Sequence, residues 1–222
     1  MTAPARIDRD QAFRYMGLRG KPEDLLVRRA DACEARLLAA AEPRYVWRVC
    51  ALSPTPEGIL CQGTGLVLTG RDIAAHLKGC RRAVLFCATL SAGVDGAIRA
   101  AGARDLLDQT VTDALASALI EQVCDGAERE ILRSFPGEYP TWRFSPGYGD
   151  LPLESQGAFL QALNAGKRLG VTLSEGGMCI PSKTVTAVIG LSPRPVAKGK
   201  RGCSVCTMGD ACHYRKKGAH CK

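Results

Sequence analysis

Residues 105–135 carry the clearest hydrophobic pattern of the chain. Apolar side chains recur there every three or four residues, at Leu107, Val111, Leu115, Ala118, Leu119, Val123 and Ala127. This is the spacing of one helix face, and Pro136-Gly137 stops it, so one long helix is predicted. Asp8 is expected to cap a short helix that ends at Gly17, and Pro22 to be the first helical residue of the next. Weaker patterns predict helices over residues 69–77, 94–101 and 153–169.

A continuous apolar run, Ala83-Val84-Leu85-Phe86-Cys87-Ala88, has the length of a strand. Because polar residues do not alternate with apolar ones there, both faces should be buried, which places this strand in the middle of a sheet. Further strands are predicted over residues 45–52, 59–61, 66–68 and 184–191, with the second and third as arms of a hairpin. The chain therefore combines helices with a sheet, and 222 residues suit one domain with a tail.

The boundary with the tail is predicted at Ser192-Pro193-Arg194-Pro195. It divides a folded domain, residues 1–193, from a basic tail, residues 194–222. The tail holds eight Lys or Arg and one acidic residue, so it carries +7 of the net charge of +8. Such a charge suits nucleic acid, an acidic redox protein or a phosphate-bearing cofactor, and equally a solvated extension.

The tail also holds four cysteines at close spacing, Cys203, Cys206, Cys212 and Cys221. Four thiolates can complete a tetrahedral ligand set for zinc or hold an iron–sulfur cluster, and spacing does not separate the two cleanly. His213 and His220 are alternative ligands. The other seven of the 11 cysteines mostly lie in apolar stretches and are expected to be small core residues.

The segment Arg143-Phe144-Ser145-Pro146-Gly147-Tyr148 combines a long cation, a Pro-Gly pair and a phenol within six residues. Proline and glycine predict a defined bend, which exposes backbone groups beside the two functional side chains. Arg143 can pair with a carboxylate through two parallel hydrogen bonds, and Tyr148 offers a flat face and a hydroxyl. The segment therefore suits a small zwitterionic ligand, or else is a surface turn with a solvated arginine.

No apolar run approaches the ~20 residues that span a bilayer, and the polar first ten residues lack the core of a signal peptide. A cytoplasmic protein without a membrane partner is expected, with reduced thiols or metal ligands instead of disulfides.

The motif around Arg143 resembles the Arg-x-x-Pro-Gly-Tyr motif of the activation domain of cobalamin-dependent methionine synthase. Matches in the same order extend over about residues 7–191, at Ile7-Asp8, Ala88-Thr89-Leu90 and Pro181-Ser182-Lys183-Thr184. The resemblance implies an α+β fold with a mixed or antiparallel sheet flanked by helices. It also implies a site for S-adenosylmethionine that comprises Asp8, Asp113, Arg143, the backbone of Ser145, and Tyr148. Gly149 stands where the family usually has proline, and Asp113 where it has a glutamate.

The resemblance further implies a methyltransferase component that reactivates methionine synthase. Such a chain would hold S-adenosylmethionine against the cobalamin of a separate corrinoid-bearing methionine synthase chain, with flavodoxin or ferredoxin as electron donor. Because cobalt must be reduced before it accepts the methyl group, this function favours an iron–sulfur cluster over zinc in the tail.

Two alternatives remain open at the level of the sequence. One is a zinc-containing nucleic-acid-binding protein that uses the basic, cysteine-rich tail. An aromatic content of 5%, with Tyr214 as the one aromatic residue of the tail, argues against base stacking there, so nucleic acid is not expected. The other is a structural subunit whose ligand site no longer functions, which Gly149 and Asp113 leave open.

Overall fold

The computed structural model describes residues 4–18 and 20–196, which fall into two compact units. Described residues within 1–47, 86–136 and 163–186 form unit 1, and those within 48–85, 137–162 and 187–196 form unit 2. The predicted boundary at residue 193 stays a prediction, because the tail from residue 197 onward lies outside the described residues.

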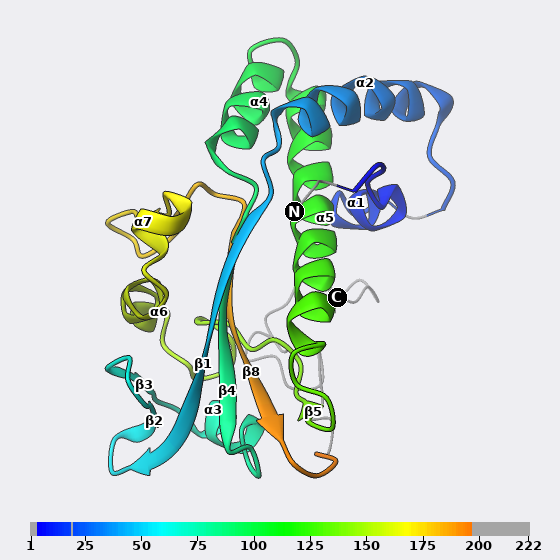
Figure 1. Ribbon diagram of the computed structural model, residues 1–222. Coiled ribbons are helices and arrows are strands. Elements are labelled where there is room, and N and C mark those ends of the chain that lie inside the picture. Colours follow the sequence, from blue (N-terminus) through cyan, green and yellow to red (C-terminus); the bar gives the residue numbers. More distant parts are fainter. Residues whose placement is uncertain (1–3, 19, 197–222) are drawn as a thin grey trace. The chain divides into compact units, whose positions relative to one another are not determined.

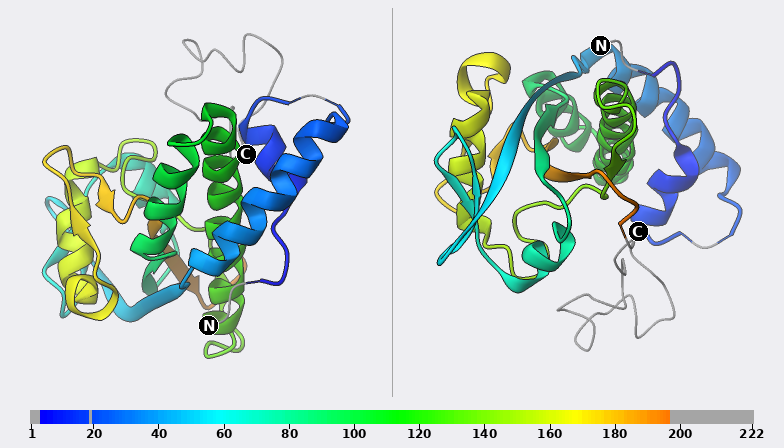
Figure 2. Two further views of the ribbon diagram at one scale, coloured as in Figure 1. Left: turned by 90° about the horizontal axis from the view of Figure 1, so that it is seen from above. Right: turned by 60° about the horizontal axis from the view of Figure 1, so that its bottom comes forward.

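Unit 1 is built around the long helix α5, Leu106–Leu132. It contacts α1 (Arg9–Tyr15), α2 (Asp24–Ala40) and α4 (Ala92–Gly102), with α1 and α4 on opposite sides of α5 (Figure 1 and Figure 2). Most residues of its predicted apolar stripe are buried, among them Val111, Leu115 and Leu119. The long helix is thus confirmed, and its N-cap is the side chain of Asp105, which accepts a hydrogen bond from the Leu107 N–H at 2.7 Å.

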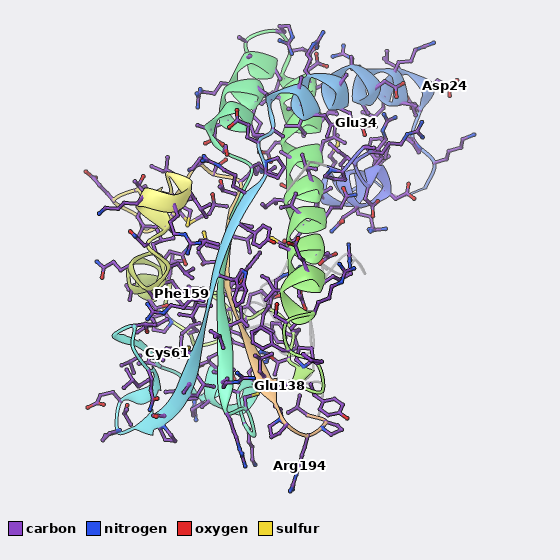
Figure 3. The ribbon with its side chains drawn as sticks, in the orientation of Figure 1. Asp24, Glu34, Cys61, Glu138, Phe159 and Arg194 are labelled. Atoms are coloured by element: carbon purple, nitrogen blue, oxygen red, sulfur yellow. The ribbon has the colours of Figure 1, made fainter. Side chains whose placement is uncertain are left out.

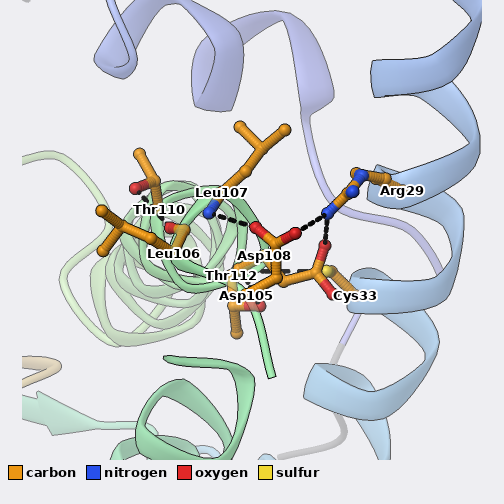
Figure 4. A network of polar contacts seen from close by, with 8 residues as sticks. All are labelled: Arg29, Cys33, Asp105, Leu106, Leu107, Asp108, Thr110 and Thr112. Carbon is orange, nitrogen blue, oxygen red and sulfur yellow. Dashed lines mark hydrogen bonds and ion pairs between the residues drawn. The ribbon is translucent and has the colours of Figure 1, made fainter. Parts of the chain in front are cut away.

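A charged network ties α2 to the start of α5 (Figure 4). The Arg29 guanidinium lies 2.8 Å from a carboxylate oxygen of Asp105 and 2.9 Å from one of Asp108. Next to it, the Cys33 thiol donates to the backbone oxygen of Asp108 at 3.8 Å. The hydrogen bond from Arg29 and the N–H of Leu107 lower the pKa of Asp105, so the interaction persists at any pH at which both carboxylates are ionised.

A second network secures the N-terminal segment of unit 1. Asp8 caps α1, because its Oδ1 accepts from the Gln11 N–H at 2.9 Å, as predicted. The buried carboxylate of Glu34, labelled in Figure 3, accepts from the Ile7 N–H at 2.8 Å and from Arg9 Nε at 2.6 Å. Both oxygen atoms of this carboxylate therefore have hydrogen-bond donors, although the side chain is buried.

Unit 2 holds residues of all six strands of the main sheet, whose order is β3-β2-β1-β4-β8-β5. The strands are β1 (Arg44–Thr55), β2 (Gly58–Cys61), β3 (Leu66–Leu68), β4 (Arg82–Thr89), β5 (Tyr139–Pro140) and β8 (Thr184–Ser192). The pairs β1/β2, β2/β3 and β5/β8 are antiparallel. All residues of β4 after Arg82 are buried, which confirms its central place. Unit 2 also contains α3 (Arg71–His76), η1 (Leu153–Ser155) and most of α6 (Gln156–Leu163).

The predicted α+β fold with its sheet and flanking helices is confirmed, but two local predictions are wrong and one hairpin was missed. The helix expected over residues 153–169 is broken at Asn164, whose φ of 52° ends α6 before α7 (Ala165–Leu169) begins. Helix α2 begins at Asp24 with Glu23 as its N-cap, so Pro22 lies outside it. The hairpin of β6 (Thr172–Leu173) and β7 (Cys179–Ile180) was not predicted. Among the described residues, no helix is long and apolar enough to cross a membrane.

Two glycines of α4 give a matched test of packing in unit 1. A β-carbon at Gly93 would overlap with the backbone oxygen of Ala40, at the end of α2, whereas one at Gly96 would meet no atom within 4 Å. We expect Gly93→Ala to lower the free energy of unfolding by about 1–3 kcal/mol, because backbone must move. Gly96→Ala should raise it by about 0.5–1 kcal/mol through helix propensity. Urea denaturation of both variants measures the difference, and two changes of the same sign would contradict the packing described.

Candidate functional site

The segment that contains Arg143 is anchored to β8 in unit 2. The Phe144 N–H donates to the Val188 oxygen at 2.9 Å, and the Val188 N–H donates back to Phe144 at 2.8 Å. Just before it, the Thr141 N–H donates to the Gly190 oxygen at 2.9 Å. These bonds extend the edge of the sheet and bury the Phe144 side chain. Arg143, next to Phe144, is half-buried.

A tight turn follows, as the Pro-Gly pair predicts. The Tyr148 N–H donates to the Ser145 oxygen at 3.0 Å, and the Gly147 N–H donates to the Leu151 oxygen at 2.9 Å. Gly147 has a φ of 83°, which a residue with a β-carbon rarely adopts. The Ser145 carbonyl keeps a second lone pair that could accept a hydrogen bond from a ligand.

Asp150 ties the end of this turn to α3. Its carboxylate accepts from the backbone N–H of Arg71 at 2.7 Å and of Asp72 at 2.9 Å, so it caps a helix 79 residues earlier in the sequence. Partial burial raises the pKa of Asp150, but the N–H donors of Asp72 and Arg71 outweigh it and leave the pKa lowered. The contact with α3 is therefore fully present at neutral pH and weakens only in acid.

Gly149 fits closely against α3. Its φ is 52°, and a β-carbon there would overlap with the Asp72 carboxylate. Proline, which the methionine synthase family usually has at this point, holds φ near −65° and cannot adopt this backbone conformation. The glycine therefore belongs to a closely packed turn.

Four aromatic rings gather around the turn, those of His76, Trp142, Phe144 and Tyr148. The Tyr148 ring lies 5.7 Å from Trp142 and 5.8 Å from Phe144, edge to face, and Tyr148 is 51% exposed. His76 Nε2 lies 2.9 Å from the Trp142 oxygen. The packing fixes the Tyr148 ring on one side and leaves the rest open, which suits a residue that contacts a ligand.

The two predicted site residues outside this segment, Asp8 and Asp113, belong to unit 1. Asp113, on α5, lies 2.8 Å from Lys183 Nζ, which also donates to Ser117 at 2.9 Å. Asp8 receives the N–H of Gln11 and donates its own N–H to Gln122 on α5 at 2.9 Å. Gln122 and Asp113 are nine residues apart, which corresponds to about 13 Å along a helix.

Sequence reasoning did not identify Lys183 as the partner of Asp113. Its side chain is only 14% exposed, and the segment before it is tied to α4, because Ser182 donates its N–H and hydroxyl to the Asp95 carboxylate at 3.0 and 2.6 Å. The one signal in the sequence was that Lys183 falls within the matched Pro181-Ser182-Lys183-Thr184 segment.

The cysteines of the described chain fit the expectation that they are core residues. Cys33, Cys50, Cys61, Cys87, Cys124 and Cys179 are buried and Cys80 is half-buried. Cys61 donates a hydrogen bond to Cys50 and thereby lowers the pKa of the Cys50 thiol. Burial, with the neighbouring Glu138 charge, raises the pKa of Cys80 to about 11.

The predicted metal ligands are not tested by the structure. Cys203, Cys206, Cys212 and Cys221 lie outside the described residues. Within residues 4–18 and 20–196, no group of three His, Cys, Asp or Glu side chains could hold a metal ion.

The class of fold is defined by the six-stranded sheet, the helix-rich unit 1 and the anchored turn from Arg143 to Tyr148. This fold matches a known domain. A crystal structure of the MetH reactivation domain bound to AdoHcy is similar with a TM-score of 0.60 and 17% sequence identity, over 96% of this chain and 82% of that one. No family model matches the sequence, and no curated protein does. The resemblance to the activation domain is thus confirmed at the level of the fold.

Two glycines of the turn test how closely it packs on α3. Gly147→Ala meets only ordinary contact at 3.6 Å, so it should cost about 1–2 kcal/mol from its positive φ. Gly149→Ala should cost about 1–3 kcal/mol more, because its β-carbon overlaps with Asp72. Adding Asp72→Ala to Gly149→Ala should recover part of that extra loss, because it removes the carboxylate but keeps the Asp72 β-carbon, 3.0 Å from the new one. Urea denaturation gives the three values, and equal losses for both glycine variants would show that the turn is not packed against α3.

Proposed function

We propose that this chain binds S-adenosylmethionine and supports the reductive remethylation of cobalamin on a separate methionine synthase chain. The observation that carries the proposal is the shared fold with a reactivation domain bound to AdoHcy, since AdoHcy is what S-adenosylmethionine becomes when it gives up its methyl group. The anchored turn from Arg143 to Tyr148 supports the same assignment.

The turn of unit 2 offers groups that match three parts of the ligand. The planar Arg143 guanidinium suits the carboxylate of the methionine moiety. The exposed face of Tyr148 suits the sulfonium cation, because an aromatic ring attracts positive charge at its face. The free lone pair of the Ser145 carbonyl can accept a hydrogen bond from an N–H or O–H of the ligand.

The two aspartates of unit 1 differ in how available they are to the ligand. Asp8 uses one carboxylate oxygen to cap α1, so the other can accept from the ammonium group of the ligand. Asp113 is already paired with Lys183, so its negative charge is balanced within the protein. From the family resemblance we assign the ammonium contact to Asp8, and we regard Asp113 as a position whose charge Lys183 offsets.

The protein in this proposal makes no covalent bond itself. In this proposal the cobalamin of the partner, reduced by one electron from flavodoxin or ferredoxin, would accept the methyl group, and AdoHcy would be released. The chain holds the methyl donor in a fixed position next to its acceptor, which can contribute about 7–11 kcal/mol to a rate in good cases.

Binding can be followed through Trp142, because its ring contacts Tyr148. The other tryptophan, Trp47, packs on Phe135 in unit 1 and is replaced by phenylalanine so that Trp142 is the sole reporter. Titration with S-adenosylmethionine should then change the emission saturably. Arg143→Ala should weaken binding at least about tenfold through loss of charge-assisted hydrogen bonds.

Arg168→Ala, which removes an exposed arginine from α7, is the control for net charge and should bind like the parent protein. If Arg143→Ala also binds like the parent, Arg143 does not contact the ligand. If the parent protein shows no saturable response and no heat of binding by calorimetry, the proposed function fails.

For the tail, we propose that Cys203, Cys206, Cys212 and Cys221 hold an iron–sulfur cluster that relays the electron, with zinc as the alternative metal. Protein purified without oxygen should be brown, contain iron and sulfide, and lose part of its visible absorbance on reduction. Cys206→Ser should lose both metal and colour, whereas Cys179→Ser, a buried cysteine of β7, should keep them. A colourless protein that contains zinc would replace the cluster by a structural zinc site.

A further inference from the structure

A hollow in unit 2 lies beside α3, next to the aromatic rings of the Arg143 turn, because His76 lines it. It has a volume of about 530 Å³ and is formed by the end of α3, the loop that follows it and the end of β8. Lys78, Arg81 and Arg194 line it with positive charge, together with His76 and Ser192. Among the described residues that line it, none is acidic. We call it the basic pocket.

The backbone on two sides of the basic pocket is fixed by hydrogen bonds. The Arg81 N–H donates to the Leu191 oxygen at 3.1 Å, and the Arg81 oxygen accepts from the Leu52 N–H at 3.0 Å. The Ser192 hydroxyl donates to the Arg194 oxygen at 2.7 Å and accepts from the Arg194 N–H at 3.2 Å. Two of the three cations are therefore presented from an ordered backbone, which lowers the entropic cost of binding.

Among the described residues of its lining, nothing balances the charge of the basic pocket. The next residue along β4, Arg82, forms an ion pair with Glu138, but neither of these residues lines the pocket. The C-terminal end of α3 contributes at most a partial negative charge of about half an electron. Three full positive charges outweigh it, so the pocket attracts anions.

A second hollow adjoins the basic pocket and indicates what else the ligand carries. It also has a volume of about 530 Å³ and shares Lys78 and Gly79 with the basic pocket. Its lining is largely apolar, with Leu52, Ile59 and Leu77 among others, and includes one acidic residue, Glu57, among the described residues. A ligand whose anionic end occupies the basic pocket can place an apolar part over Gly79 in this neighbour. Each volume lies within the range of about 300–1,000 Å³ that small-molecule sites have.

We infer that the two hollows together bind a small organic phosphate. Its phosphoryl group lies between Arg81, Arg194 and Lys78, since arginine matches the oxygens of a phosphoryl group with parallel N–H donors. A doubly charged phosphoryl group also offsets three cations better than a single carboxylate does. Arg143, Ser145 and Tyr148 line neither hollow, so the inference does not depend on the proposed function.

The test is calorimetry of the full chain with phenyl phosphate and with inorganic phosphate. Phenyl phosphate should bind about tenfold more tightly, because its ring buries apolar surface in the second hollow. Arg81→Gln and Arg194→Gln should each weaken the binding of phenyl phosphate about tenfold by removing a charge-assisted hydrogen bond. Equal affinity for the two probes would overturn the organic phosphate as the ligand.

Arg82→Gln is the matched control. It removes the same charge from the neighbouring residue, which is paired with Glu138, so it should leave affinity within about twofold. A second full-length variant, Lys216→Gln/Lys217→Gln, lowers the charge of the tail and should have no larger effect. A loss in Arg82→Gln or in the tail variant that equals the loss in Arg81→Gln would show a general attraction of anions and overturn the site. Thermal unfolding of each variant confirms that it is folded.

Discussion

The strand β4 is the constraint on which the arrangement of the sheet depends. Its residues from Ala83 to Thr89 are buried, so its backbone groups cannot be satisfied by water. An unpaired buried N–H or carbonyl costs about 1–3 kcal/mol, and β4 therefore requires a hydrogen-bonded neighbour on each edge. Those neighbours are β1 and β8. The free edge of β8 in turn receives β5 and Phe144, which places the Arg143 turn. A short apolar run thus determines where the candidate site is built.

The parts of the fold that the sequence predicts are those that local chemistry determines. The apolar run of β4, the stripe of α5 and the cap Asp8 can each be read from a few adjacent residues. The break between α6 and α7 could not be read in this way. Asn164 adopts a left-handed conformation there, which an asparagine tolerates but does not require, so the pattern on either side looked continuous.

The candidate site also has one part that local sequence predicts and one part that it does not. The bend of the motif follows from Pro146 and Gly147, whose backbone preferences act within the segment itself. The contact that holds this bend does not, because Asp150 caps a helix 79 residues away. In unit 1, the pairing of Lys183 with a carboxylate 70 residues away cannot be read from the sequence either. No spacing rule connects such positions, since the fold alone brings them together. The hollows next to α3 escaped notice for the same reason, because their lining comes from separate segments.

The contact between His76 and the Trp142 oxygen joins α3 to the segment that leads into the turn. A carbonyl oxygen can only accept, so His76 Nε2 carries the hydrogen of this bond. The centre of the same imidazole ring lies 4.5 Å from that of Trp142 and 5.0 Å from that of Phe144, so one side chain holds both the backbone and the rings beneath Tyr148. Replacing this histidine would therefore disturb the turn without altering any residue of the motif itself.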